Sequence, residues 1–147
     1  VLGLYVWTAF PSIPGGDSGE LLAEACHLGI PHPPGICPCC KQEGYLLFTP
    51  GAVAWASNLL CCLLGAGASV LSCLSVEEWT WESPVAYNEG AAMASSLLFA
   101  LGPVVWEYST GTEVFALNNF LVAAAIYLTV RIFRRPSLRA ARVGAVV

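Results

Sequence analysis

Residues 44–76 read GYLLFTPGAVAWASNLLCCLLGAGASVLSCLSV and contain no charged side chain. A helix needs roughly 20 predominantly apolar residues to cross the hydrocarbon core of a bilayer. This run is well beyond that length, and it is too long and too free of charge for the buried core of a soluble domain. We therefore predict a membrane-spanning helix here and place it at residues 51–76.

The composition of the whole chain also indicates a membrane protein. Hydrophobic residues make up 56% of the 147 residues and charged residues only 11%, with a mean hydropathy of +0.67. Soluble domains carry about 25% charged residues, which argues against an ordinary soluble enzyme, and the net charge of −4 argues against a nucleic-acid-binding protein. Further charge-free runs lie at residues 1–16, 90–106 and 114–130. Together they predict an all-α polytopic membrane protein with about four transmembrane helices, the first of them truncated.

These runs divide the chain into six segments. We expect the end of a first transmembrane helix at 1–10, a loop at 11–50, a transmembrane helix at 51–76, a second loop at 77–89, a pair of transmembrane helices joined by a short turn at 90–133, and a basic segment at 134–147.

The basic residues predict the orientation in the membrane. Five of the six follow the last apolar run, namely Arg131, Arg134, Arg135, Arg139 and Arg142. Cytosolic flanks collect Lys and Arg, so the C-terminal segment and, by alternation, the loop at 77–89 are expected in the cytosol. The turn at 107–113 and the loop at 11–50 are then luminal.

The first loop carries the residues that point to chemistry. Asp17 follows Pro14-Gly-Gly and stands where a helix N-cap would, with Glu20 three residues later, as in a capping box. The two carboxylates are therefore either a structural cap or a general base held beside the lipid surface, where burial would favour a raised carboxyl pKa. His32 lies between Pro31 and Pro33, which restrict its backbone, so its imidazole could contact an anionic group.

Two blocks of sequence carry a family resemblance. Pro11-Ser-Ile-Pro-Gly-Gly-Asp-Ser-Gly-Glu-Leu21, continued by His27-Leu-Gly-Ile-Pro-His-Pro-Pro-Gly35, closely resembles the first luminal loop of the transmembrane protein 260 family. Trp106-Glu-Tyr-Ser109 and Thr112-Glu-Val-Phe-Ala-Leu-Asn-Asn119 resemble a later block of the same family, and Asn58-Leu-Leu-Cys-Cys62 is a weaker third match. The proteins of this family are several times longer, so we expect an N-terminal fragment, with residues 36–44 interrupting the family pattern.

The resemblance implies a multi-pass membrane enzyme of the endoplasmic reticulum with a partial GT-C glycosyltransferase architecture. Such an enzyme moves mannose from dolichyl phosphate mannose, the lipid-linked donor, to Ser or Thr of receptor domains. We expect no cofactor, and we expect no metal site because the Cys37-Pro-Cys-Cys40 cluster has no spaced second pair of ligands. Carried over to this chain, the resemblance assigns Asp17 as the general base. We further expect Glu20 to orient either Asp17 or the acceptor, and His32 to lie near the donor phosphate. Glu113 and Asn118, in the second block, are expected to line the substrate pocket.

A second hypothesis remains open at this point. A small multi-span structural or transport protein without catalytic activity, whose loop carboxylates bind cations, would also be acidic and apolar. Asn118 and Asn119 fit it as well. Amides in a membrane span are costly unless they face protein or water, so we expect both to face the bundle interior. The small residues at 65–69 fit close helix packing in either case.

Overall fold

The computed structural model describes residues 1–27 and 50–134 of the chain. Within these two ranges it contains helices and no strand, which confirms the all-α class. The helices are α1 (Leu2–Thr8), α2 (Ser18–His27), α3 (Pro50–Trp79), α4 (Val85–Ala100), α5 (Pro103–Thr110) and α6 (Val114–Arg134).

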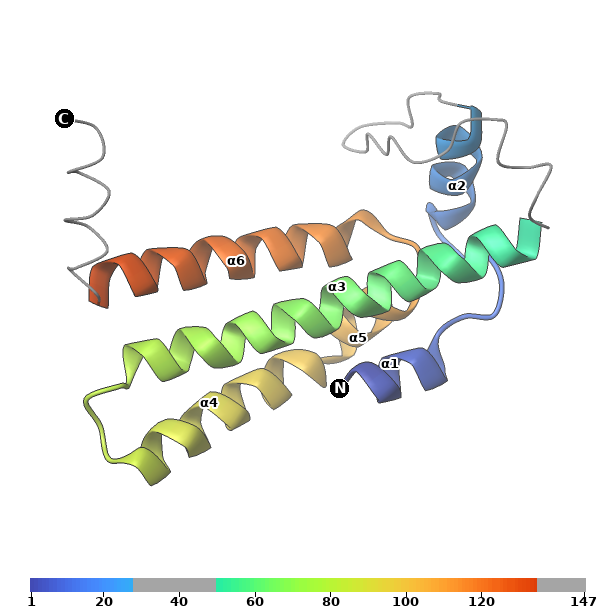
Figure 1. Ribbon diagram of the computed structural model, residues 1–147. Coiled ribbons are helices and arrows are strands. Elements are labelled where there is room, and N and C mark those ends of the chain that lie inside the picture. The colour runs from blue at the N-terminus through green and yellow to red at the C-terminus, as the bar shows by residue number, and fades with distance from the viewer. Residues whose placement is uncertain (28–49, 135–147) are drawn as a thin grey trace, which may run out of the picture.

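Helix α3 is the central element of the bundle. It begins at Pro50, a residue that suits the first turn of a helix because it has no N–H to donate. Its 30 residues correspond to about 45 Å at 1.5 Å per residue, which exceeds the thickness of a bilayer core. Helices α4 and α6 lie along it, and α1 and α5 pack near its middle (Figure 1).

Helices α3 and α6 run in the same direction. At one end, the Thr112 hydroxyl just before α6 donates a 2.6 Å hydrogen bond to Asn58, near the start of α3. At the other end, the Arg134 guanidinium donates a 2.7 Å hydrogen bond to the carbonyl of Trp79. The chain between Trp79 and Thr112 must therefore return along the whole bundle, and α4 followed by α5 makes this return (Figure 1).

The returning segment is a bent helix pair. Helices α4 and α5 meet at an angle of 64° across Leu101 and Gly102. Pro103 occupies the first turn of α5, and a proline ring cannot continue the preceding helix without a clash. The charge-free run at 90–106 predicts one uninterrupted helix, and the break at Gly102-Pro103 was not predicted.

The predicted number of four spans is not confirmed. Within residues 1–27 and 50–134, two helices are long and apolar enough to cross a membrane, at Ala52–Trp79 and Val114–Arg134, and the bent α4–α5 pair makes three if it counts as one span. Helix α1 has seven residues within the described part of the chain. The segment between spans is also shorter than the expected loop at 77–89, because α3 continues to Trp79 and α4 begins at Val85.

The helices approach closely through small residues. Gly65 of α3 faces the Ser109 side chain and the ring of Tyr5, and a Cβ on Gly67 would lie 2.8 Å from the ring of Phe120. Tyr5 is fully buried and donates a 2.7 Å hydrogen bond to the carbonyl of Ala100. The small residues of this span therefore form contacts with three other helices, as expected for helix packing in membranes.

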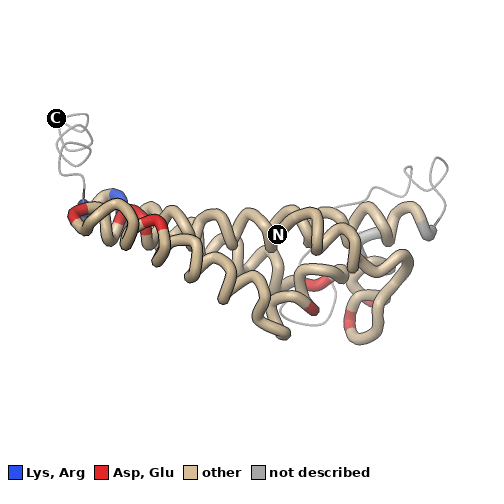
Figure 2. Tube along the Cα trace, turned by 90° about the horizontal axis from the view of Figure 1, so that it is seen from below, with Lys and Arg blue, Asp and Glu red and all other residues tan. Residues whose placement is uncertain are grey.

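Charged residues gather at the two ends of the bundle and leave its middle free of them (Figure 2). The loop that contains Asp17 and the turn before α6 lie at one end, whereas the α3–α4 turn and Arg134 lie at the other. The described parts of the two segments expected in the lumen thus share one end, and the turn at 80–84 and Arg134, both expected in the cytosol, share the other. Which end faces the lumen stays a prediction.

Candidate active site

A buried amide holds the first loop against the turn before α6. The Asn58 side chain is fully buried, and its Nδ2 donates to the carbonyls of Phe10, at 2.8 Å, and Ser12, at 2.9 Å. Its Oδ1 accepts the hydrogen bond from Thr112 Oγ1. The Phe10 N–H also donates directly to the Thr110 carbonyl at 3.1 Å. These bonds join two segments that lie about a hundred residues apart in the sequence.

The turn that precedes α2 places Asp17 at the mouth of this junction. Gly16 has a φ of 76°, which is accessible to glycine at little cost. Asp17 follows it directly, and its carbonyl accepts a 2.9 Å hydrogen bond from the Leu21 N–H, which closes the first turn of α2. The Asp17 side chain is exposed. The residue therefore occupies the N-cap position predicted for it, with its carboxyl accessible from outside.

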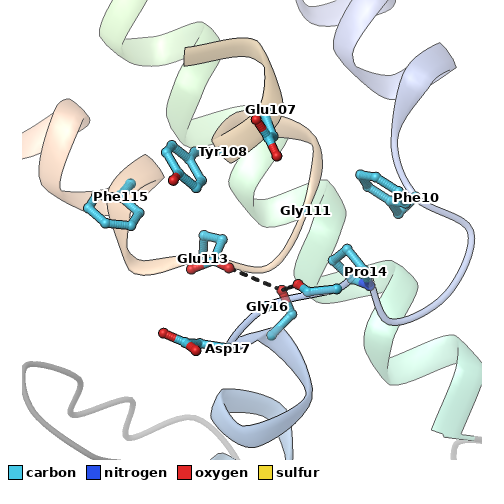
Figure 3. Close-up of a pocket in the computed structure, with 11 residues that line it drawn as sticks. Phe10, Pro14, Gly16, Asp17, Glu107, Tyr108, Gly111, Glu113 and Phe115 are labelled. Atoms are coloured by element: carbon cyan, nitrogen blue, oxygen red, sulfur yellow. Dashed lines mark hydrogen bonds between the residues drawn. The ribbon is translucent and has the colours of Figure 1, made fainter. Parts of the chain in front are cut away.

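The two segments enclose a pocket of about 430 Å³. This volume falls within the range of small-molecule sites. Figure 3 shows the carboxyls of Asp17 and Glu113 near each other, with Tyr108 and Phe115 on one side of Glu113 and with Phe10 and Pro14 on the other. The lining residues come from the first loop and α2 (Phe10, Pro14, Gly15, Gly16, Asp17, Ser18) and from the α5–α6 region (Glu107, Tyr108, Gly111, Glu113, Phe115).

Glu113 is the more enclosed of these two carboxylic acids. It is half-buried, and its Oε1 accepts a hydrogen bond of 3.4 Å from the Ser18 hydroxyl. Burial raises the pKa of the Glu113 carboxyl above its ordinary value, and the negative charges of Asp17 and Glu107 raise it further, while the Ser18 hydrogen bond opposes the shift. A carboxyl with a raised pKa in a pocket is a typical feature of a functional site.

Glycine allows the two walls of the pocket to approach. A Cβ on Gly111 would lie 2.9 Å from Cγ of Pro14, so a larger residue would push the first loop away from α5. A Cβ on Gly16 would meet Oε1 of Glu113 at 3.4 Å. Both glycines lie where the backbone of one segment contacts the other.

The structure brings together only part of the predicted site. Asp17 and Glu113 line the same pocket, although the two predictions came from separate blocks of sequence. Glu20 lies in the first turn of α2, is exposed, and is not among the residues that line the pocket. His32 lies outside the described residues.

The two asparagines of α6 have different surroundings. Asn118 is exposed and does not line the pocket that contains Glu113. Asn119 is half-buried and lines a second pocket, of about 300 Å³, together with Ser72 of α3 and Ser95 of α4. The expectation that both amides face the bundle interior is therefore met by Asn119 and not by Asn118.

Two residues of the site were missed as functional candidates. Glu107 lines the pocket, and its negative charge acts on Glu113. The feature of the sequence that could have identified Glu107 is its place in the second family-like block, Trp106-Glu-Tyr-Ser109. Asn58 was noted only as part of a weak family match, although an amide within an apolar span is expected to have polar partners.

The pocket is acidic. Asp17, Glu107 and Glu113 line it, whereas the two arginines in the described ranges, Arg131 and Arg134, lie at the far end of α6. The search of residues 1–27 and 50–134 finds no group of three His, Cys, Asp or Glu side chains placed to hold a metal ion. Within that part of the chain, the site therefore offers carboxyl groups and aromatic rings to a ligand.

Comparison with known proteins gives the same family. The family described as Protein O-mannosyl-transferase TMEM260 N-terminal domain matches residues 17–146. The chain is 33% identical over 132 residues to the protein O-mannosyl-transferase tmem260 of Dictyostelium discoideum. This alignment covers 86% of this chain and 15% of that protein. The chain is 37% identical over 133 residues to the protein O-mannosyl-transferase TMEM260 of Mus musculus, and this alignment covers 89% of this chain and 18% of that protein.

These matches extend over most of the chain, but the chain spans less than a fifth of the length of either relative. No solved structure is significantly similar. The pocket residues Asp17, Glu107 and Glu113 all lie within the matched range. The chain belongs to the TMEM260 family of protein O-mannosyl-transferases and corresponds to its N-terminal domain.

Proposed function

We propose that this chain is the membrane-embedded N-terminal part of a protein O-mannosyltransferase of the endoplasmic reticulum, and that its acidic pocket forms part of the active site. The observation that carries the proposal is the convergence of Asp17 and Glu113 on one pocket. The names of the relatives support the reaction class. The donor is dolichyl phosphate mannose, and the acceptors are Ser or Thr hydroxyls of receptor domains in the lumen.

The proposed chemistry is a single displacement with inversion. The acceptor oxygen attacks the anomeric carbon of mannose while the bond from that carbon to the phosphate oxygen breaks, and Asp17 takes the proton of the hydroxyl. Dolichyl phosphate departs as an anion, so no second carboxylic acid has to protonate it, in contrast to glycoside hydrolysis. The exposed position of Asp17 at the pocket mouth suits a base that has to meet a polypeptide acceptor.

The remaining carboxyl groups have a different role in this proposal. Positive charge develops at the anomeric carbon in the transition state of glycosyl transfer, and nearby carboxylates stabilise it. Glu107 and Glu113 are placed to supply this stabilisation and to accept hydrogen bonds from sugar hydroxyls. The two described arginines are at the opposite end, so the donor phosphate requires other groups, among which we propose His32.

The test is mannose transfer in cells that lack the endogenous enzyme. Full-length protein that contains this segment is compared with its Asp17→Asn variant, and mannose on a receptor domain is measured by mass spectrometry. Asp17→Asn keeps the shape of the side chain and removes its basicity, so we expect loss of transfer with normal membrane insertion. Glu24→Gln, on the same helix but away from the pocket, is the matched control and is expected to transfer normally.

Two results would contradict the proposal at different levels. Normal transfer by a well-expressed Asp17→Asn variant would remove Asp17 from the mechanism while leaving the enzyme class intact. No transfer by well-expressed wild-type protein would contradict the enzyme class and favour a structural or transport role for the chain.

A further inference from the structure

Two aromatic rings form one wall of the pocket and have no role in the chemistry described so far. Tyr108 lies near the end of α5 and Phe115 near the start of α6, and the centroids of their rings are 4.5 Å apart with an angle of 33° between the planes. Both line the pocket beside Glu113. At this distance and angle the rings stack on each other, so each covers one face of its partner. Figure 3 shows the pair close together, with the carboxyl of Glu113 next to them.

The wall is incompletely covered by the described part of the chain. Phe115 is 45% exposed, and Tyr108 is half-buried. An aromatic ring that remains partly exposed in a pocket offers apolar surface, and covering that surface is favourable. A ligand with one apolar face would therefore gain free energy by packing here.

The combination of exposed rings and carboxyl groups fits one chemical class of ligand. A hexose ring has faces of C–H bonds that pack against aromatic rings, and hydroxyls around its edge that donate hydrogen bonds to carboxylates. Asp17, Glu107 and Glu113 line the same pocket as the rings. A small anion would be repelled by the negative charges of these carboxyl groups, and a purely apolar ligand would bring no hydrogen-bond donors to them.

We propose that the stack of Tyr108 and Phe115 presents an outer ring face as the platform on which the mannosyl ring of the lipid-linked donor packs during transfer. The inference rests on the proposed function and adds the sugar subsite to it. The two rings act as positioning residues: they hold the sugar so that its anomeric carbon is presented to the acceptor oxygen near Asp17. Flat stacking surface, rather than apolar volume alone, is the property that this role requires.

A structural role for the same pair makes a different prediction. The rings also join α5 to α6, and apolar volume alone would satisfy that role. Phe115→Leu keeps an apolar side chain of similar size but removes the flat ring, whereas Phe115→Tyr keeps the ring. The platform therefore predicts a loss for leucine and retention for tyrosine, while a packing role predicts little change for either.

The experiment uses full-length protein in membranes or detergent, with dolichyl phosphate mannose and a receptor-domain acceptor varied separately. For Phe115→Leu we expect the KM for the donor to rise roughly three- to tenfold, the size of a lost aromatic contact, with the KM for the acceptor unchanged. Tyr108→Leu should act in the same way, and Phe115→Tyr should stay close to wild type. Phe133→Leu, an exposed phenylalanine at the far end of α6, is the matched control.

The outcomes separate this proposal from the proposed function. An unchanged donor KM in well-folded Phe115→Leu and Tyr108→Leu variants would overturn the platform, even if Asp17→Asn abolishes transfer. A rise in the acceptor KM alone would also overturn it, because the wall would then bind the polypeptide. If Phe115→Leu does not fold, a tenfold rise in donor KM for Phe115→Tyr would contradict the proposal. Absence of transfer by the wild-type protein would remove both.

Discussion

At the end of the bundle that carries the pocket, the fully buried Asn58 side chain makes three hydrogen bonds between distant segments. It donates to the carbonyls of Phe10 and Ser12 and accepts from the Thr112 hydroxyl. At the opposite end, Arg134 makes the long-range contacts, and it does so at the surface. Its Nη1 lies 3.7 Å from Oε1 of Glu82, and these two side chains are 32% and 75% exposed.

The contacts at the two ends therefore differ in how much they contribute to the free energy of unfolding. Exposed ion pairs contribute about 0–1 kcal/mol because water and salt screen them. A buried polar group that loses its partner costs about 1–3 kcal/mol, since it cannot turn to water instead. The end with the candidate site is thus held by a buried amide whose loss is costly, whereas the exposed contacts at the opposite end tolerate change.

The largest effect is expected from Asn58→Asp. This change keeps the shape of the side chain but replaces the amide that donates to two carbonyls with an oxygen that repels them. We expect a loss of at least about 2 kcal/mol in the free energy of unfolding, together with loss of transfer. The measurements are the melting temperature of purified full-length protein and its transferase activity.

Asn88→Asp is the matched control for this comparison. The Asn88 amide lies at the opposite end and donates one 3.3 Å hydrogen bond, to the carbonyl of Glu77. A small change for Asn88→Asp beside a large change for Asn58→Asp would sharpen the contrast between the ends. Equal melting temperatures for the two variants would show that the buried amide does not hold the site together.

An intermediate effect is expected from Glu113→Gln, and it depends on pH. Because the pKa of Glu113 is raised in the folded protein, its charged form opposes folding above that pKa, and its protonated form does not. The stabilising contribution of protonation is fully present below the ordinary pKa of a glutamate and is lost as the pH rises through the raised value. Neutral glutamine should therefore raise the melting temperature at neutral pH.

The difference between this variant and the wild type should shrink as the pH falls through the raised pKa. Melting temperatures of the full-length protein at a series of pH values measure it, with Glu89→Gln, an exposed glutamate at the other end, as the control. A Glu113→Gln variant that melts below the wild type at every pH would contradict the prediction.

The smallest effect is expected from Glu82→Gln. The change removes a single exposed partner of Arg134, which keeps its hydrogen bonds to the carbonyls of Glu78 and Trp79. We expect the free energy of unfolding to fall by less than about 1 kcal/mol and mannose transfer to stay unchanged. A destabilisation as large as that of Asn58→Asp, measured by the same thermal unfolding, would show that the ends do not differ in this way.

Much of the fold follows from patterns along the chain. The charge-free run at 44–76 contains most of α3, and the run at 114–130 lies within α6, because only long apolar helices satisfy both the backbone and the lipid. The bend between α4 and α5 was missed although Gly102-Pro103 is a known helix-breaking pair. Residues 90–106 carry no charged side chain, and this composition had predicted a single helix across the pair.

The position of a side chain around a helix could not be taken from the motif alone. Ala116 is fully buried in α6, and Asn118 follows it by about 200° of helical rotation, so it lies on the other side. Asn119, a further 100° around, returns toward the buried side and lines the second pocket. Both asparagines belong to the family-like block, but only Asn119 lies toward the side of α6 that packs on α3.

By itself, the sequence determined that the chain is a helical membrane protein, where its long helices lie, and that Asp17 begins a helix after a glycine turn. Those properties depend on neighbours along the chain and on transfer into lipid. Only the tertiary structure decided that Glu113 and Glu107 share a pocket with Asp17 and that Tyr108 and Phe115 form its wall. The physical reason is that these residues lie far apart in the sequence, and only the packing of α3 against α5 and α6 brings buried Asn58 within hydrogen-bonding distance of both loops.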